Sequence, residues 1–187
     1  MKAEWNRFES WLKAHFPEGY GDLNEPATDE QISILESKLN VNLPLEFVEF
    51  LKIHNGQRGE SGWIIGGSEL LSVERIIDEW EVWNGLLVGG EFEDCKNKRD
   101  NGVKDDWWNP NWVPFTYDGG GNHLCIDLDP AESGTTGQII TMWHDELDRK
   151  ILATSFEMWF ALYVQDVESG KYIYSDDYEA IVNANDV

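Results

Sequence analysis

The residues with the clearest potential for chemistry are His123, Cys125 and Asp127, which alternate along one predicted strand. Alternate residues of a strand point to the same face, so an imidazole, a thiol and a carboxylate would share one surface. Such a set could supply a nucleophile with a neighbouring base. However, alternate positions lie about 7 Å apart, and acidic surroundings raise a thiol pKa instead of lowering it. We therefore interpret Cys125 as a buried or half-buried thiol and predict that the protein is not an enzyme.

The carboxylates after this strand could instead suggest a metal site. The candidate ligands are Asp127, Asp129, Glu132, His144 and Asp145. Their spacing lacks the third oxygen ligand and the glycine of a calcium loop, and the zinc-type pairs of His or Cys are absent from the sequence. Aspartates at strand ends more often organise turns. The sequence therefore predicts neither a metal nor a cofactor.

A glycine cluster precedes the strand. Asp118-Gly119-Gly120-Gly121 separates two strand-like runs, at 112–117 and 122–128. A phosphate-binding loop would lead into a helix and would have a lysine nearby, whereas here an apolar strand follows. Glycine adopts positive φ at little cost, so this cluster predicts a tight hairpin turn. The face of Leu124, Ile126 and Leu128 is expected to be apolar, and the opposite face to be polar.

The elements that must position these residues follow from hydrophobic periodicity and capping signals. Thr28 to Gln31 matches a capping box, and Ser72 and Ser155 can each begin a helix. Helices are expected at about 3–16, 28–39, 43–55, 72–87 and 155–170, and further strands at 63–65, 138–143 and 150–152. Residues 172–187 are expected to form a short strand or helix. This order predicts a single α+β domain over 1–187, with a curved antiparallel sheet packed by helices from both chain ends.

The charge balance limits the possible partners. The 187 residues include 36 acidic and 14 basic side chains, giving a net charge of −22. Nucleic acids and anionic membranes require clustered Lys and Arg, so both are excluded as expected partners, whereas a basic protein would be attracted. Two cysteines and no secretory signal indicate a cytoplasmic protein with free thiols. The basic island at Lys96, Lys98, Arg99 and Lys104 is expected to be a solvated, mobile loop with 100–102 at its tip.

The predicted helix at 72–87 is the best candidate for recognition. Its outer face is acidic, and a tryptophan surrounded by carboxylates would suit a basic protein surface. The spacing of Trp80 and Trp83 with Ile76 also allows both rings to face the core, and this alternative stays open for Trp83. The predicted partner-binding residues are Glu74, Asp78, Glu79, Glu81, Trp83, Glu91, Glu93, Asp94, Asp127 and Asp129.

A series of short motifs resembles a known family. It comprises Leu43-Pro44, His54-Asn55-Gly56, 112–115, 118–122, 125–130, 137–139 and Ser155-Phe156 with Trp159. In this order the motifs resemble the SUKH superfamily, which includes Smi/Knr-type regulators of cell-wall assembly and glucan synthesis and many bacterial immunity proteins. The likeness covers about 25–165. The matching residues, interpreted as fold-specifying, are Leu43, Pro44, Asn55, Gly56, Trp112, Pro114, Asp118, Gly120, Asn122, Asp127 and Gly137.

The resemblance implies a curved antiparallel sheet with packed helices and a protein-binding function without catalysis. Together with the charge, it favours an immunity protein that neutralises a cationic toxin domain, such as a nuclease, by direct contact. The alternative is a regulatory scaffold in cell-wall assembly or signalling, as the yeast members suggest. The chain departs from the compact family pattern at about 69–111, where the acidic helix and the basic loop are expected to be an elaboration.

Overall fold

The computed structural model describes residues 1–93, 95 and 98–187. The helices of this part of the chain are α1 Lys2–His15, α2 Pro17–Gly21, α3 Asp29–Leu39, α4 Leu45–Leu51, α5 Val73–Val88 and α6 Phe156–Glu168. The strands are β1 Glu69–Leu70, β2 Lys98–Arg99, β3 Trp112–Pro114, β4 Thr116–Tyr117, β5 His123–Asp127, β6 Gln138–Met142, β7 Asp148–Arg149, β8 Ile151–Ala153, β9 Tyr172–Ser175 and β10 Ala180–Asn183.

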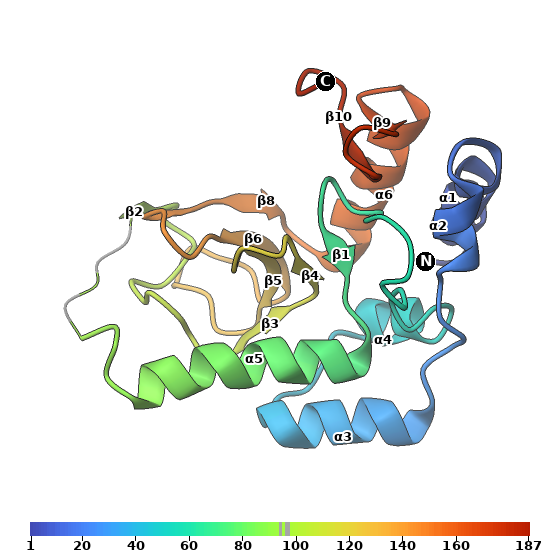
Figure 1. Cartoon of the computed structure of the whole chain (residues 1–187). Coiled ribbons are helices and arrows are strands. Elements are labelled where there is room, and N and C mark those ends of the chain that lie inside the picture. Colours follow the sequence, from blue (N-terminus) through green and yellow to red (C-terminus); the bar gives the residue numbers. More distant parts are fainter. Residues whose placement is uncertain (94, 96–97) are drawn as a thin grey trace.

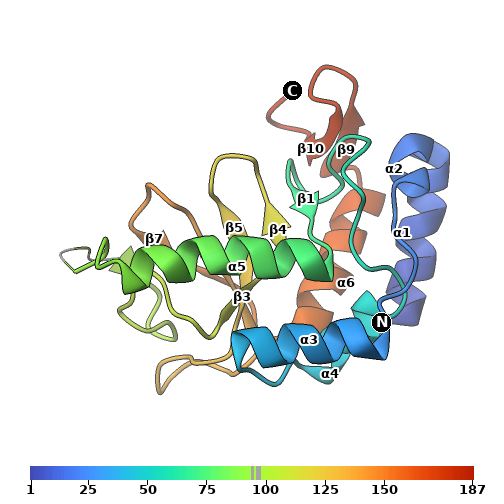
Figure 2. The same cartoon turned by 60° about the horizontal axis from the view of Figure 1, so that its bottom comes forward.

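The central sheet has the strand order β3-β5-β6-β8, with every neighbouring pair antiparallel. Its register places Ile126 between Val113 and Ile139, so these apolar side chains share one face. α5 runs across the sheet with α3 beside it, while α1 and α6 pack together at one end (Figures 1 and 2). The prediction of an α+β domain with an antiparallel sheet packed by helices from both ends of the chain is therefore confirmed.

The main core lies between the sheet and the helices α1, α4 and α6. Trp5 and Phe8 of α1 face this core because they follow helical spacing, and both are fully buried. The Phe156 ring contacts the rings of Phe50 and Phe115 at centroid distances of 4.8 and 5.2 Å. Each buried aromatic ring removes roughly 150–250 Å² from water, so this cluster supplies much of the driving force for folding.

Side-chain caps confirm the predicted starts of α3, α5 and α6. The hydroxyl of Thr28 accepts the Gln31 N–H, and the Gln31 side chain accepts the Thr28 N–H, which completes the capping box of α3. The hydroxyl of Ser155 caps α6 by accepting the Met158 N–H. The end of α4 was predicted too late, because the helix stops at Leu51 instead of continuing to 55.

Two further predictions are corrected. Residues 63–65 form isolated bridges, one of them between Trp63 and Ala180, and no strand. The described part of the basic island is not a free loop, because β2 pairs in parallel with β7. Its supposed tip at Gly102 is docked against Gly134, and the Gly102 carbonyl accepts hydrogen bonds from the Ala131 N–H and the Gln138 amide. Lys96 lies outside the described residues.

The predicted strand or helix at 172–187 is an antiparallel hairpin of β9 and β10. This hairpin lies at the end of the molecule where α1 and α6 pack (Figure 1). Whether 69–111 is an elaboration of the family fold stays a prediction.

Candidate functional site

α5 forms one wall of the candidate site, and two side chains fix its first turn. Ser72 accepts the Arg75 N–H, and the Asn55 side-chain oxygen accepts the Val73 N–H at 2.8 Å. The backbone at Gly56 packs closely against the segment before α5, because a Cβ on Gly56 would lie 2.4 Å from the Leu71 backbone. Gly56 also has a φ of +65°, which favours glycine. The family-motif residues Asn55 and Gly56 thus set where α5 begins.

The predicted polar face of β5, with His123, Cys125 and Asp127, is buried under α5. These three residues have at most 1% of their surface exposed. A second, smaller core covers them, and its members include Trp83, Trp108, Trp112, Val103, Ile140 and Met142. The periodicity of one strand cannot reveal such a cover, because it comes from a distant part of the chain.

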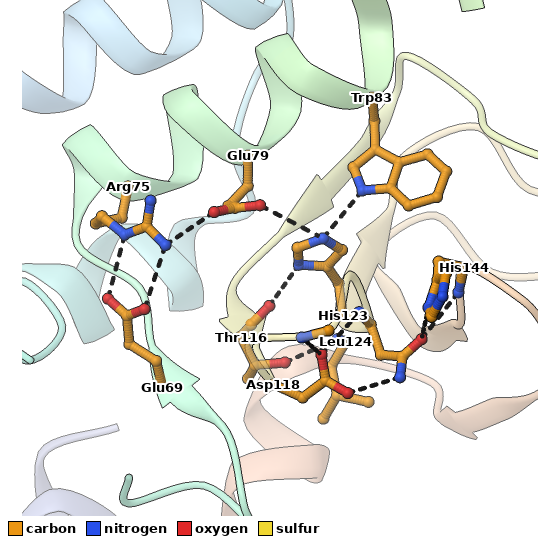
Figure 3. Close-up of polar contacts among 11 residues, drawn as sticks. Glu69, Arg75, Glu79, Trp83, Thr116, Asp118, His123, Leu124 and His144 are labelled. Carbon is orange, nitrogen blue, oxygen red and sulfur yellow. Dashed lines mark hydrogen bonds and ion pairs between the residues drawn. The ribbon is translucent and has the colours of Figure 1, made fainter. Parts of the chain in front are cut away.

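His123 is the centre of a hydrogen-bond network under α5 (Figure 3). Its Nδ1 lies 2.7 Å from the Thr116 carbonyl, which can only accept, and its Nε2 lies 3.1 Å from the indole N–H of Trp83, which can only donate. The imidazole is therefore neutral, with its proton on Nδ1. Burial lowers the pKa of His123 to about 4, in agreement with this assignment.

Glu79 connects this network to the surface (Figure 3). Its carboxylate lies 2.8 Å from Arg75 and 3.8 Å from Nε2 of His123. Burial raises the pKa of Glu79 even though the Arg75 guanidinium opposes this effect. Arg75 also binds Glu69 of β1, at 3.3 Å. Glu79 is therefore held by contacts within the fold, and only part of its side chain is available at the outer surface.

Cys125 and Asp127 offer no accessible reactive group. Burial raises the pKa of the Cys125 thiol, so the thiolate is disfavoured, and the interpretation of a buried thiol is confirmed. The Asp127 carboxylate accepts the Gln138 amide at 2.8 Å and the Asp129 N–H at 3.0 Å. Burial raises the pKa of Asp127 as well. Each of these groups is engaged in packing or hydrogen bonds inside the fold.

The glycine cluster forms the predicted hairpin turn between β4 and β5. One Asp118 oxygen accepts the N–H groups of Gly120 and Asn122, at 2.8 and 2.9 Å. The side-chain oxygen of Asn122 in turn accepts the backbone N–H of His144, at 2.8 Å. Gly119 and Gly121 both have positive φ, which explains why glycine is needed. The turn is thus fixed at its base and attached to the segment after β6.

A groove lies between α5 and this turn, and we call it the acidic groove. Its volume is about 400 Å³. The apolar side chains that line it are Val82, Trp83, Leu86, Phe92, Trp107 and Tyr117. The opposite wall is formed by Gly119, Gly120, Gly121 and His144, and Glu79 lies at the rim. The groove thus joins the acidic helix to the glycine turn, two features that the sequence suggested separately.

Arg149 holds the Trp107 wall of this groove in place. Although it is fully buried, its guanidinium donates to the carbonyls of Trp107 and Glu146 at 3.0 and 2.9 Å. It also lies over the Trp107 ring, 5.0 Å from the centroid. Burial lowers the pKa of Arg149 to about 10, which leaves it charged at neutral pH. No sequence pattern indicates this residue, because a buried arginine has no characteristic spacing.

The predicted partner-binding residues fall into several groups. Trp83 and Asp127 are 6% and 0% exposed, so neither can serve as a surface contact and both assignments are corrected. Asp129 is paired with Lys104, away from α5. Asp94 lies outside the described residues. Exposed carboxylates remain at Glu74, Asp78, Glu81, Glu91 and Glu93, and their role stays a prediction.

Sequence reasoning missed the apolar residues of the groove. Val82 and Leu86 are four residues apart on α5, so they lie on one side of the helix, outside the stripe formed by Ile76 and Trp83. They are 59% and 39% exposed. Apolar side chains at this spacing on a helix face rich in carboxylates were the signal that could have revealed them.

A second hollow lies on the other side of the β4–β5 hairpin. It has a volume of about 530 Å³ and lies over Leu124, Thr141 and Leu152 of the sheet. Trp143 and Tyr172 also line it. Its charged groups are engaged within the protein, since Asp118 binds its own turn and Lys150 lies 3.5 Å from Asp148. This hollow therefore carries one cation and one anion that both have partners within the protein, unlike the acidic groove.

The described residues include neither a cluster of metal ligands nor a membrane-spanning helix. Within the described residues, no three His, Cys, Asp or Glu side chains lie close enough together to hold a metal ion. No helix in the same part of the chain has the length and apolar character needed to cross a bilayer.

The family motifs converge on the sheet and on the segments next to it. Gly137, with a φ of +89°, donates its N–H to the Asp127 carbonyl and lies next to Pro44. Residues 26–162 match the model of the SMI1/KNR4 family (SUKH-1). The chain belongs to this family. The matched region runs from just before α3 into α6 and includes α5 and the whole central sheet.

Three fungal relatives illustrate the family. The glucan synthesis regulatory protein of Neurospora crassa is 27% identical over 95% of this chain and 40% of its own length. The cell wall biosynthesis/cell cycle regulator smi1 of Schizosaccharomyces pombe is 29% identical over 95% of this chain and 38% of its own. The cell wall assembly regulator SMI1 of Saccharomyces cerevisiae is 25% identical over 92% of this chain and 41% of its own length. This chain thus spans about two fifths of these relatives.

Proposed function

We propose that this protein is a non-enzymatic, cytoplasmic protein-binding module that takes part in regulating cell-wall assembly or glucan synthesis. The observation that carries the proposal is its membership of the SMI1/KNR4 family, together with relatives named as regulators that align over 92–95% of the chain. The burial of His123, Cys125 and Asp127 supports a role without catalysis, because these groups are inaccessible to a substrate.

The expected partner is a basic protein. A net charge of −22 favours rapid association with a cationic surface and disfavours nucleic acids and anionic membranes. In this role the domain would act by holding a partner, and its effect on the cell wall would come through that partner. Regulation by binding requires only a stable surface, which the capped α5 and the fixed hairpin turn provide.

A domain exchange in Saccharomyces cerevisiae tests this proposal. The region of its cell wall assembly regulator that aligns with this chain is replaced by residues 1–187, and growth is measured in the presence of a dye that stresses the cell wall. We expect the chimera to grow better than the strain that lacks the regulator. A chimera carrying Phe156→Ala, which disrupts the core, serves as the negative control. A soluble, well-expressed chimera that grows no better than this control would contradict the proposal.

A second candidate is a toxin-neutralising immunity protein, which the resemblance to the SUKH superfamily and the net charge of −22 favour. The fungal regulators described above support it less than they support the wall-regulator role. Co-expression with cationic nuclease toxin domains in bacteria distinguishes the two candidates. Restored growth with a stable complex would favour the immunity role. Continued killing by every toxin would rule out the immunity role.

A further inference from the structure

The outer side of α5 combines exposed apolar side chains with carboxylates. Val82 and Leu86 are 59% and 39% exposed, and Val88 at the end of the helix is 81% exposed. Large apolar side chains grouped at a groove are a common mark of an interaction site. Val82 and Leu86 line the groove together with Phe92 and Trp107. The apolar floor is therefore accessible, whereas the Trp83 ring at its base is held by His123.

Exposed carboxylates lie near this floor on α5 and on the segment that follows it. Asp78 is one helical turn before Val82, and Glu91 and Glu93 flank Phe92 in the sequence. Glu81 lies on the other side of α5, 3.4 Å from Lys38 of α3. Among the described residues, no cation lies within ion-pair distance of Asp78, Glu91 or Glu93. This rim thus has negative charge that the described part of the fold does not neutralise.

The walls of the groove are held before any partner arrives. Arg149 fixes Trp107, and Asp118 and Asn122 fix the glycine turn and His144. Trp83 is anchored to His123 below the floor. A surface that is already ordered loses little conformational freedom on binding, which favours affinity.

We propose that the acidic groove binds a positively charged segment of a partner protein, which inserts one or two apolar side chains against Val82, Leu86 and Trp107. Lys or Arg residues flanking these anchors pair with Asp78, Glu91 and Glu93. The inference rests on the proposed protein-binding function and names the surface and the partner chemistry. The apolar contacts supply most of the binding affinity. The rim charges increase the association rate and determine which partner is chosen.

Other occupants fit this surface less well. A second copy of the chain also has a net charge of −22, so self-association through the acidic rim would bring like charges together. A nucleic acid would be repelled for the same reason. A neutral apolar segment would leave the rim carboxylates without partners, and the hollow over Leu152, whose charged groups already have partners, suits it better.

Selection from a random 16-residue peptide library on the immobilised full-length chain tests the proposal. We expect enriched peptides to combine Lys or Arg with one or two large apolar residues. Leu86→Lys should weaken their binding by about tenfold or more, because a new cation repels the peptide and removes an apolar contact. Leu162→Lys on α6 is the matched control, since Leu162 is also an exposed leucine on a helix, at 48%, and its change should leave the affinity unchanged.

Three outcomes would overturn the proposal: no enrichment, enriched peptides without basic residues, or equal binding to the Leu86→Lys and Leu162→Lys variants. Equal binding would mean that net charge alone attracts the peptides. Circular dichroism of both variants shows whether each remains folded, and Val82→Lys repeats the test if Leu86→Lys unfolds. A negative selection with a working domain exchange in yeast refutes only the groove assignment. A positive selection with a failed exchange refutes only the wall-regulator role.

Discussion

On one face of β5, Ile126 packs into the main core among apolar side chains from the helices. On the other face, His123, Cys125 and Asp127 lie under α5 in a core that includes Trp83 and Trp108. The first core is held mainly by aromatic packing. The second also contains the hydrogen bond from the Trp83 indole to His123, and its buried Trp108 indole nitrogen, like that of Trp5 in the first core, has no hydrogen-bond partner among the described residues.

This difference shows how one sheet can serve stability and recognition together. The main core lies between the sheet and the helices, and none of its buried members lines the groove. The second core positions α5, Trp107 and the glycine turn, which form the groove walls. A change in the main core should therefore affect stability alone, whereas a change in the second should affect the groove as well.

The largest expected contrast is in thiol reactivity. Cys95 is exposed and Cys125 is fully buried, with its pKa raised by burial. Alkylation of Cys125 requires opening of the second core, so native Cys125 should react on the order of a thousandfold or more slowly than Cys95. Iodoacetamide labelling followed by mass spectrometry measures both rates. Comparable rates would mean that the second core is open in solution.

The main core is tested by Phe156→Ala. The ring of Phe156 contacts Phe47, Phe50, Phe115 and Trp159. Removing it leaves a cavity among rigid rings, and we expect the free energy of unfolding to fall by about 3–5 kcal/mol. Urea denaturation followed by circular dichroism gives this value. A loss below about 1 kcal/mol would show that the cluster repacks and is less important than its burial suggests.

The second core should show a specific pH dependence. The ordinary pKa of His123 is 6.5, and burial lowers it to about 4 in the folded state. Between these values the unfolded chain binds more protons, so the free energy of unfolding should fall by about 3 kcal/mol as the pH drops from 6.5 to 4. Glu79 and Asp127, whose pKa values are raised by burial, act in the opposite direction.

A comparison of variants isolates the contribution of His123. His123→Gln should remove this part of the pH dependence, while His15→Gln, at an exposed position on α1, should retain it. Urea titrations at several pH values from 4 to 7 provide the comparison. If His123→Gln follows the wild-type pH curve, the imidazole is not buried in its neutral form.

The smallest expected effects concern the helix caps. Ser155 begins α6, which packs into the main core, and Ser72 begins α5, whose first turn packs into the main core and whose Trp83 belongs to the second. Ser155→Ala and Ser72→Ala should each lower the free energy of unfolding by about 1 kcal/mol, because one backbone N–H loses its acceptor. Thermal unfolding measures both. Only Ser72→Ala is expected to weaken binding of the selected peptides as well, and an equal effect of Ser155→Ala would argue against a separate role for the second core.

Local signals in the sequence determined much of the fold. The capping residues Thr28, Ser72 and Ser155 and the aspartate–glycine turn at 118–121 fixed where elements begin and end, because caps and turns depend on neighbouring residues. The order of the motifs was sufficient to identify the family. The net charge also limited the possible partners, since it does not depend on the fold.

The tertiary structure alone decided which of the polar and aromatic residues are accessible. Trp83 was compatible with either the core or the surface, and its burial follows from contacts with His123 and Trp108, which are far away in the sequence. The segment at 100–102 has the composition of a free loop but is docked beside Gly134. Such long-range packing depends on which distant segments meet. The hydrophobic periodicity of a single strand or helix does not contain that information.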